Sequence, residues 1–183
     1  MLKDNIFITG FMGTGKTTVA DALVRKTGKT LIDTDKVIET REGKSIAEIF
    51  NTEGEVYFRR IERQVLTEIA NRRNTVIATG GGTLLAEENY QLALQNGIVI
   101  LLQASPKILL SRLQEENSRP LLAEDNKMAR IVDLMNKRKD RYSRFKHCID
   151  TSYLTVNQVV DKIIQICRRG NNENNTIEIR KKI

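Results

Sequence analysis

Residues 5–18 read NIFITGFMGTGKTT, and this stretch decides how the rest of the chain can be interpreted. It begins with a short apolar run at 5–9, which is typical of a buried strand. The segment from Gly10 to Thr17 then matches the pattern G-x-x-x-x-G-K-[ST] in full. A helical period follows over 16–27, with apolar residues on one face. A strand before this pattern and a helix after it predict a phosphate-binding loop.

The predicted loop has the parts that hold a nucleoside triphosphate. Its glycines allow backbone N–H groups to close around phosphate oxygens, and the following helix adds partial positive charge at its N-terminus. We expect Lys16 to contact the β- and γ-phosphates and the Thr17 hydroxyl to be a ligand of Mg²⁺. A GTPase would also need a guanine-reading Asn-Lys-x-Asp. The nearest match, residues 136–139, reads NKRK within a predicted helix, which disfavours a switch GTPase.

Beyond the loop, apolar runs of strand length alternate with stretches of helical period. Strands are expected at 5–9, 30–33, 75–79, 97–103 and 148–150, helices at 16–27, from 106, at 128–145 and from 155, and capping-box helix starts at Ser45-Ile-Ala-Glu48 and Thr52-Glu-Gly-Glu55. This alternation predicts an α/β fold, a five-stranded parallel sheet flanked by helices, with ligands at the carboxyl ends of the strands. We expect one domain over 1–170. A polar tail at 171–183 lacks apolar periodicity and is expected to be flexible.

The composition is that of a globular protein. Of 183 residues, 40% are hydrophobic and 29% charged, and the longest apolar run is too short to span a membrane. One histidine, His147, and two cysteines, Cys148 and Cys167, exclude a zinc site made of Cys and His ligands and disfavour a disulfide scaffold. We therefore expect a reducing cytoplasm and no secretory signal. The net charge of +7 suits anionic substrates, and the chain lacks the aromatic–basic pattern that stacks bases.

Two pairs of charged residues, one at the end of the second predicted strand and one on a later predicted helix, suggest an acceptor site. Asp33 and Asp35 are two residues apart, so in an extended chain both carboxylates would project to one side, one towards a metal and one towards an acceptor hydroxyl. Turn chemistry with helix capping by Asp35 is the alternative. Farther on, Glu62 lies on the apolar stripe of a predicted helix, three residues after Arg59. We favour an ion pair that orients Arg59 into a cleft, over a solvated surface pair.

Three further features fit a site for an anionic acceptor. The triplet Gly80-Gly81-Gly82 ends the third predicted strand and allows a ligand to approach the backbone closely, although a tight turn is the alternative. Arg138 lies on the apolar stripe of a long helix, where a guanidinium needs an anionic partner unless its stem extends to the surface. Arg119 lies in a polar loop, about 115–127, that is a candidate lid, although it could equally be a surface arginine.

Taken together, these residues resemble the shikimate kinases, within the nucleoside-monophosphate-kinase-like group of P-loop proteins. The resemblance covers most of residues 5–165 and rests on Gly10–Thr18, Asp33-Thr34-Asp35, SIAEIF at 45–50, Gly54-Glu55, Phe58-Arg59 with Glu62, Gly80–Gly82, RPLL at 119–122, and Arg138 with Tyr142. One departure is that the family commonly reads Arg-x-Pro-Leu-Tyr where this chain has RKDRY at 138–142. A missing proline should only straighten the local helix, so Arg138 keeps its assignment.

The resemblance implies a P-loop kinase domain that transfers the γ-phosphoryl group of ATP to the 3-hydroxyl of shikimate, a step of aromatic amino-acid biosynthesis. It implies that ATP is bound by Gly13, Thr14, Gly15, Lys16, Thr17, Thr18, Arg112 and Arg119, that Mg²⁺ is held by Thr17 and Asp33, and that shikimate is bound by Asp35, Arg59, Gly80, Gly81, Gly82 and Arg138. Lys16, Asp35 and Arg119 would be the catalytic residues. The acceptor-binding segment would be about 33–62, and Arg112 would pack on adenine.

Two other functions stay open at this stage. A kinase of another small hydroxy acid, such as gluconate, is the nearest, although two arginines favour a compact cyclic acid. A nucleic-acid-binding module with a vestigial nucleotide site is suggested by the sequence pI of about 9.5. We expect instead a monomer whose partners are shikimate and ATP, with no nucleic acid and no membrane.

Overall fold

A five-stranded parallel sheet forms the centre of the protein in the computed structural model, which describes residues 5–114 and 126–180. The strands lie in the order β2-β3-β1-β4-β5 and comprise β1 Asn5–Gly10, β2 Thr30–Asp33, β3 Thr75–Ala78, β4 Gly97–Gln103 and β5 His147–Asp150. Every pairing is parallel. The predicted fold class is confirmed, and each strand end agrees with the prediction to within one residue.

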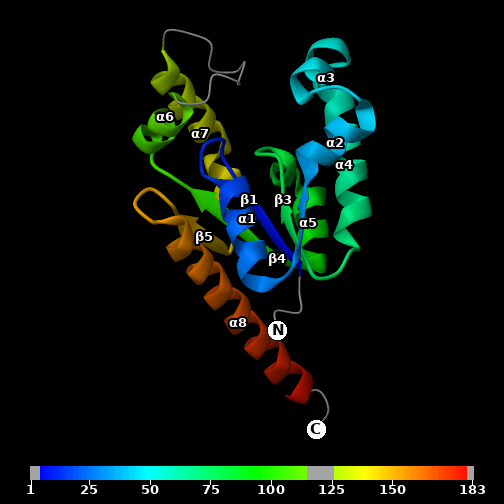
Figure 1. The fold of residues 1–183 in the computed structure, drawn as a ribbon, viewed down its shortest axis with the longest axis vertical. Coiled ribbons are helices and arrows are strands. Elements are labelled where there is room, and N and C mark those ends of the chain that lie inside the picture. Colours follow the sequence, from blue (N-terminus) through cyan, green and yellow to red (C-terminus); the bar gives the residue numbers. More distant parts are fainter. Residues whose placement is uncertain (1–4, 115–125, 181–183) are drawn as a thin grey trace.

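Helices cover both faces of this sheet (Figure 1). They are α1 Lys16–Thr27, α2 Thr34–Glu42, α3 Ile46–Thr52, α4 Gly54–Ala70, α5 Glu87–Asn96, α6 Pro106–Gln114, α7 Lys127–Ser143 and α8 Val156–Arg180, with the 3-10 turn η1 at Thr83–Leu85. One core lies between the sheet and α4, α5 and the end of α7, and a second core lies between the sheet and α1 and α8. A third, smaller core joins the phosphate loop to α6 and α7.

The central strand shows why the sheet has two covered faces. All six residues of β1 are buried, with Phe7 in the first core and Ile6 and Ile8 in the second. Side chains alternate between the faces of a strand, so a strand buried on both sides reads as a continuous apolar run. Fully burying side chains of this kind contributes about 1.5–3 kcal/mol each to folding.

The two predicted capping boxes have different outcomes. At the start of α3, the Ser45 hydroxyl accepts from the backbone of Glu48, whose carboxylate accepts from the backbone of Ser45, so this box is confirmed. The predicted box at Thr52–Glu55 is wrong, because Thr52 belongs to α3 and its hydroxyl donates to the Glu48 carbonyl at 2.9 Å. The helices separate at Gly54, whose φ of +83° is a left-handed conformation that favours glycine.

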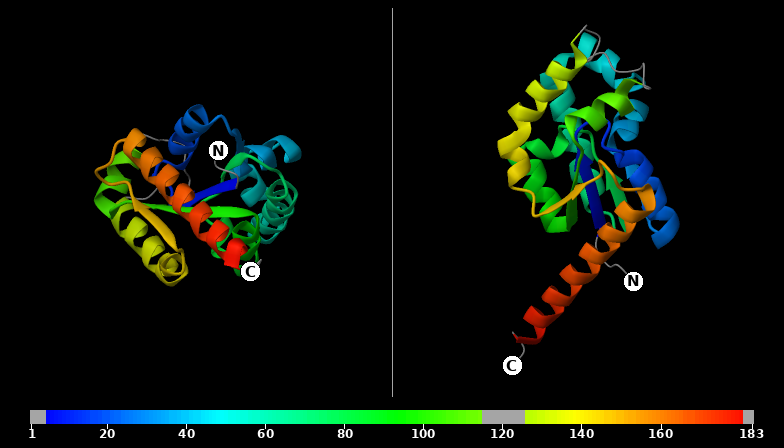
Figure 2. Two further views of the ribbon diagram at one scale, coloured as in Figure 1. Left: turned by 90° about the horizontal axis from the view of Figure 1, so that it is seen from below. Right: turned by 90° about the vertical axis from the view of Figure 1, so that its left-hand side faces the viewer.

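The C-terminal tail also differs from the expected irregular chain, because α8 continues to Arg180. The right-hand view of Figure 2 shows its last turns extending beyond the sheet. The helix is anchored by Val159, Ile163 and Cys167 in the second core. Once a helix is nucleated, each added residue gains a backbone hydrogen bond, and Gly170 costs only about 1 kcal/mol relative to alanine. A lack of apolar periodicity therefore did not end the helix.

Candidate active site

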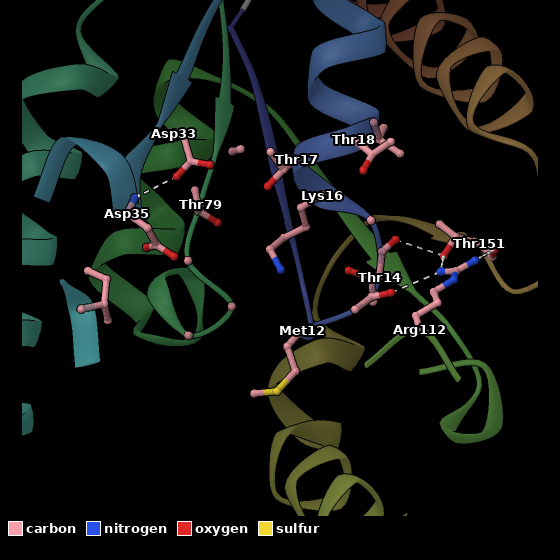
Figure 3. A pocket seen from close by; sticks show the side chains of 18 of the residues that line it. Met12, Thr14, Lys16, Thr17, Thr18, Asp33, Asp35, Thr79, Arg112 and Thr151 are labelled. Carbon is pink, nitrogen blue, oxygen red and sulfur yellow. Dashed lines mark hydrogen bonds between the residues drawn. The ribbon is translucent and has the colours of Figure 1, made fainter. Parts of the chain in front are cut away.

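The carboxyl ends of β1, β2 and β3 open onto a cavity of about 510 Å³. The phosphate loop lines one part of it, and residues of α2, α3, α4, α6, α7 and α8 and of the segments after β3 and β5 line other parts. Figure 3 shows Asp33 and Asp35 across the cavity from Lys16 and Thr17, with Arg112 and Thr151 at its other end. Because β1 lies between β3 and β4, the loop after it leaves the sheet where the order of the strands reverses, which is the usual ligand position in such folds.

The phosphate loop has the backbone expected of an anion site. Gly13 and Gly15 have φ angles of +77° and +88°, and Gly15 directly precedes α1. The Thr14 hydroxyl donates to the Phe11 carbonyl at 2.8 Å and closes the loop internally. The ammonium of Lys16 donates to the carbonyls of Gly10 at 3.0 Å and of Phe11 at 3.2 Å, so it lies over the loop rather than out in solvent.

Asp33 lines the cavity and also stabilises the start of α2. It is the N-cap of α2, and one of its carboxyl oxygens accepts from the backbone N–H groups of Asp35 at 3.0 Å and Lys36 at 3.3 Å. Its second oxygen is not used by these bonds. Thr17 is solvent-exposed at the start of α1 and lines the same cavity. One hydroxyl and one carboxylate suit Mg²⁺, which keeps several waters and is completed by substrate phosphates.

Asp35 is not extended, as the sequence analysis assumed, but lies in the first turn of α2. Capping by Asp33 starts the helix immediately after β2, so the alternative in which Asp35 caps the helix is wrong, and Asp33 is the cap instead. The Oδ1 atom of Asp35 is buried and accepts no hydrogen bond from the described residues. Burial, followed by the charges of Asp33 and Glu62, raises the pKa of Asp35 from 3.8 to about 6. The result is a carboxylate that binds a proton more readily than an ordinary aspartate.

The ion pair predicted between Arg59 and Glu62 is present. Arg59 Nη1 lies 2.9 Å from Glu62 Oε2, and Glu62 is only 2% exposed. Glu55, one turn earlier on α4, accepts from both Nε and Nη2 of Arg59 at 3.2 Å and 3.0 Å. A guanidinium has five N–H donors, so donors on Nη1 and Nη2 are left over for a ligand. Two carboxylates thus hold Arg59 at the wall of the cavity.

Arg138 reaches the cavity from α7, as its place on the apolar stripe predicted. Its guanidinium donates to the Gly81 carbonyl at 3.1 Å and lies 5.1 Å from the centre of the Phe11 ring. The residue is half-buried, and its charge is close enough to the Tyr142 hydroxyl to act on the pKa of that group. The alternative, in which the stem of Arg138 extends to the surface, is wrong, because the guanidinium stays against the glycine segment.

The glycines after β3 lie close to polar side chains of the cavity. A Cβ atom on Gly80 would lie 2.7 Å from Asp35 Oδ1, 3.0 Å from Thr83 Oγ1 and 3.2 Å from Glu62 Oε1. A Cβ atom on Gly82 would lie 2.9 Å from Nη1 of Arg59. Polar side chains from α2, α4 and η1 therefore converge on this backbone, and a side chain added to Gly80 or Gly82 would displace them.

Comparison with known proteins assigns the chain to a family. A family model described as shikimate kinase matches residues 12–168. A shikimate kinase of Thermodesulfovibrio yellowstonii is 41% identical over 168 residues, which is 92% of this chain and 97% of that protein. The chain belongs to the shikimate kinase family. It is accordingly an ATP-dependent kinase.

Solved structures agree with the shikimate kinase fold. The shikimate kinase of Acinetobacter baumannii, solved in complex with shikimate, superposes with a TM-score of 0.85 at 35% identity and covers 91% of this chain and 94% of its own. A gluconokinase of Sinorhizobium meliloti superposes with a TM-score of 0.60 at 15% identity, covering 96% and 97%. This second likeness is one of fold alone.

Two nucleotide-site residues implied by the family pattern have different outcomes. Arg112 lines the cavity, and its guanidinium donates to the carbonyls of Gly13 and Thr151 at 3.3 Å and 2.9 Å. It therefore connects the phosphate loop to the segment after β5. Arg119 lies outside the described residues, as does the predicted lid at 115–127 apart from its last two positions. The role of Arg119 stays a prediction.

Other contacts in this shikimate kinase family member were missed by the sequence analysis. Glu55 is four residues before Arg59, so helical spacing could have indicated the pair. Arg144, at the end of α7, donates to the carbonyls of Leu84 and Leu85 at 3.1 Å and 2.9 Å. Thr83 Oγ1 donates to Glu62 Oε1 at 2.6 Å. Nothing in the local sequence indicates these last two contacts, because each joins distant segments.

Replacing Gly82 with alanine should raise the KM for shikimate about tenfold and leave the KM for ATP unchanged. The φ of Gly82, −111°, suits alanine, so the backbone is not strained, but the new methyl group displaces the guanidinium of Arg59. Steady-state kinetics with each substrate varied, together with a thermal melt, measure this. An unchanged KM for shikimate would show that Arg59 does not act at the position it occupies here.

Proposed function

We propose that this protein catalyses the Mg²⁺-dependent transfer of the γ-phosphoryl group of ATP to the 3-hydroxyl of shikimate, giving shikimate 3-phosphate for the chorismate pathway. The observation that carries the proposal is Asp35, a carboxylate that lines one cavity with the phosphate loop and whose pKa burial raises to about 6. Family membership supports the choice of shikimate as acceptor.

On the nucleotide side, the phosphate loop and the start of α1 bind the triphosphate through Gly13, Thr14, Gly15, Lys16, Thr17 and Thr18. Thr17 and the second oxygen of Asp33 would hold Mg²⁺, which when bound neutralises charge on the phosphates and orients them. The residues fit this ion because phosphates and water would supply most of its ligands. Among the described residues, no three His, Cys, Asp or Glu side chains group as an all-protein metal site. Arg112 packs on adenine.

On the acceptor side, Arg59 and Arg138 bind the carboxylate of shikimate, and the backbone of Gly80, Gly81 and Gly82 lies against it. Guanidinium groups match a carboxylate in shape and charge, and each of these two retains unused donors. Asp35 accepts a hydrogen bond from the reacting hydroxyl and takes its proton as the new bond to phosphorus forms. Lys16 stabilises the transferring group, and Arg119 completes this from the lid. The acceptor-binding segment is about 33–62.

An acceptor panel tests the proposal. ADP release should require Mg²⁺ and be strongly stimulated by shikimate, weakly or not at all by gluconate, and should be slow without an acceptor. The physical reason is that phosphoryl transfer depends on positioning, and two arginines position a compact cyclic acid. A coupled assay measures ADP, and mass spectrometry of the product checks that it is a shikimate phosphate. Equal turnover without any acceptor would indicate a plain ATPase.

We further propose that the protein works as a monomer in the cytoplasm, without nucleic acid or membrane partners. The described helices include none that is both long and apolar enough to cross a bilayer. Sedimentation velocity tests the oligomeric state. Binding to an oligonucleotide with a steep dependence on salt would instead favour the nucleic-acid alternative.

A further inference from the structure

Glu62 is a buried carboxylate whose two oxygens have different partners. Its Oε2 atom pairs with Arg59 Nη1 at 2.9 Å, and its Oε1 atom accepts from Thr83 Oγ1 at 2.6 Å. An ionised carboxylate costs a large free energy when it is removed from water, unless it is paired and hydrogen-bonded. Both partners are therefore needed to hold this charge 2% exposed beside the cavity.

Thr83 has little freedom to place its hydroxyl elsewhere. The residue is 0% exposed at the start of η1. Its backbone N–H donates to the Gly80 carbonyl at 3.2 Å, and its carbonyl accepts from Asn89 Nδ2 at 2.9 Å. These contacts fix the backbone on both sides of the side chain. The fold of the loop after β3 thus fixes the position of the Thr83 side chain, and in the rotamer present its hydroxyl donates to Glu62 Oε1.

We infer that Thr83 is a positioning residue for the acceptor site: its hydroxyl holds Oε1 of Glu62, so that Glu62 grips Arg59 through one oxygen only. This inference rests on the proposed function. Held in this way, the guanidinium stays against Gly82 with donors on Nη1 and Nη2 directed to a carboxylate ligand. Thr83 itself need not touch the substrate.

The expected failure without the hydroxyl is specific. Oε1 would be left buried without the donor it has here, whereas Arg59, already paired with Oε2 of the same carboxylate, carries unused N–H groups. Carboxylate and guanidinium groups favour a two-point, parallel pairing. Glu62 would then take two N–H groups of Arg59 in place of one, which turns the guanidinium and removes a donor from the acceptor. Affinity for shikimate should fall, whereas the phosphate loop is unaffected.

The test compares Thr83→Val, which keeps the size and removes the hydroxyl, with Thr83→Ser, which keeps the hydroxyl. We expect Thr83→Val to raise the KM for shikimate about five- to twentyfold, with kcat within about threefold and the KM for ATP unchanged, and Thr83→Ser to restore it. Thr83→Ala removes the same hydroxyl with less crowding and provides a second variant. An unchanged KM for shikimate in a folded Val or Ala variant, or no rescue by Ser, would overturn the inference.

Thr75→Val is the matched control. Thr75 is 3% exposed, and its hydroxyl donates to Asn5 Oδ1 at 2.9 Å at the other end of β3, away from the cavity. The Thr75→Val variant should have a lower melting temperature and an unchanged KM for shikimate. An equal rise in KM from Thr75→Val would show a general loss of structure and count against the inference.

A double-mutant cycle with Arg59→Lys separates positioning from structure. If Thr83 acts through Arg59, Thr83→Val should change shikimate affinity, measured by calorimetry, by less than twofold in the Arg59→Lys background. An undiminished loss in that background would overturn the inference. Absence of shikimate turnover in the unmodified protein would overturn the proposed function as well, whereas normal turnover with a normal Thr83→Val variant would overturn the inference alone.

Discussion

Arg138→Met should weaken shikimate binding about thirty- to a thousandfold while ATP affinity, measured without shikimate, barely changes. Methionine keeps the bulk of the stem but removes the charge and all five donors. A lost pair of charge-assisted bonds to a carboxylate costs about 2–4 kcal/mol, which is this change in affinity. The free protein loses one bond to the Gly81 carbonyl, the contact with the Phe11 ring and the interaction with the Tyr142 hydroxyl. Its melting temperature should therefore change little. Titration calorimetry with shikimate measures the effect.

Arg141→Met is the matched control for this variant. Arg141 lies three residues later on α7, is exposed, and donates to the Leu85 carbonyl at 3.3 Å, outside the cavity lining. Shikimate affinity should stay within about twofold of the unmodified protein. Comparable losses in both variants would mean that α7 as a whole has shifted. Normal binding by Arg138→Met would mean that Arg138 does not hold the carboxylate.

Asp35→Asn should reduce kcat by about two to four orders of magnitude at pH 8, because the amide cannot accept the proton of the reacting hydroxyl. The same change should stabilise the fold at that pH. Burial raises the pKa of Asp35 from 3.8 to about 6, so its charged form is disfavoured in the folded state. Above pH 6 the gain in the free energy of unfolding of the variant is about 3 kcal/mol at most. The charged carboxylate of Asp35 therefore favours activity but lowers the stability of the fold at pH 8.

The sign of the pH dependence gives an independent measurement. The folded protein binds the proton of Asp35 more tightly than the unfolded chain does, so stability from this group is fully present below pH 3.8. It is lost as the pH rises through about 6. Denaturant unfolding without nucleotide or Mg²⁺ should show equal stability of Asp35→Asn and the unmodified protein near pH 4 and a more stable variant at pH 8. Parallel curves, or near-normal turnover by the variant, would contradict the assignment.

Asp133→Asn serves as the carboxylate control. Asp133 lies on the outer side of α7, where it pairs with Lys137 at 2.9 Å and is 47% exposed. An exposed pair of this kind contributes little to stability because water screens it. The variant should keep normal turnover, and its stability should follow that of the unmodified protein across the same range of pH.

The sequence by itself determined the parts of this protein that are written in contiguous residues. The phosphate loop is a pattern of eight positions, and the strand before it and the helix after it have periods that can be counted. The same is true of the inward places of Glu62 and Arg138, since residues that share a helix face recur every three or four positions. The order of these segments was enough for the parallel sheet and the family.

Errors in the sequence analysis arose where two local explanations competed. Asp33 and Asp35 fitted both an extended strand end and a helix start, and the hydrogen bonds from Asp33 to the first turn of α2 decided for the helix. Likewise, Thr52 had the spacing of a capping box, but the left-handed Gly54 separates it from α4. The tail beyond 170 lacked an apolar stripe, yet α8 extends into it because propagation of a helix needs no partner.

Only the tertiary structure decided what surrounds each functional group. The pKa of Asp35 is raised mainly by burial, then by the charge of Asp33 and by that of Glu62, which is 27 positions away in the chain. The bond from Thr83 to Glu62 spans 21 positions, and the closeness of Gly82 to Arg59 spans 23. Contacts of this kind arise when α4 packs against η1 and the glycine segment after β3, and no repeat in the sequence records them. The sequence alone therefore shows which residue types form the site. The protonation and the direction of their side chains depend on the tertiary structure.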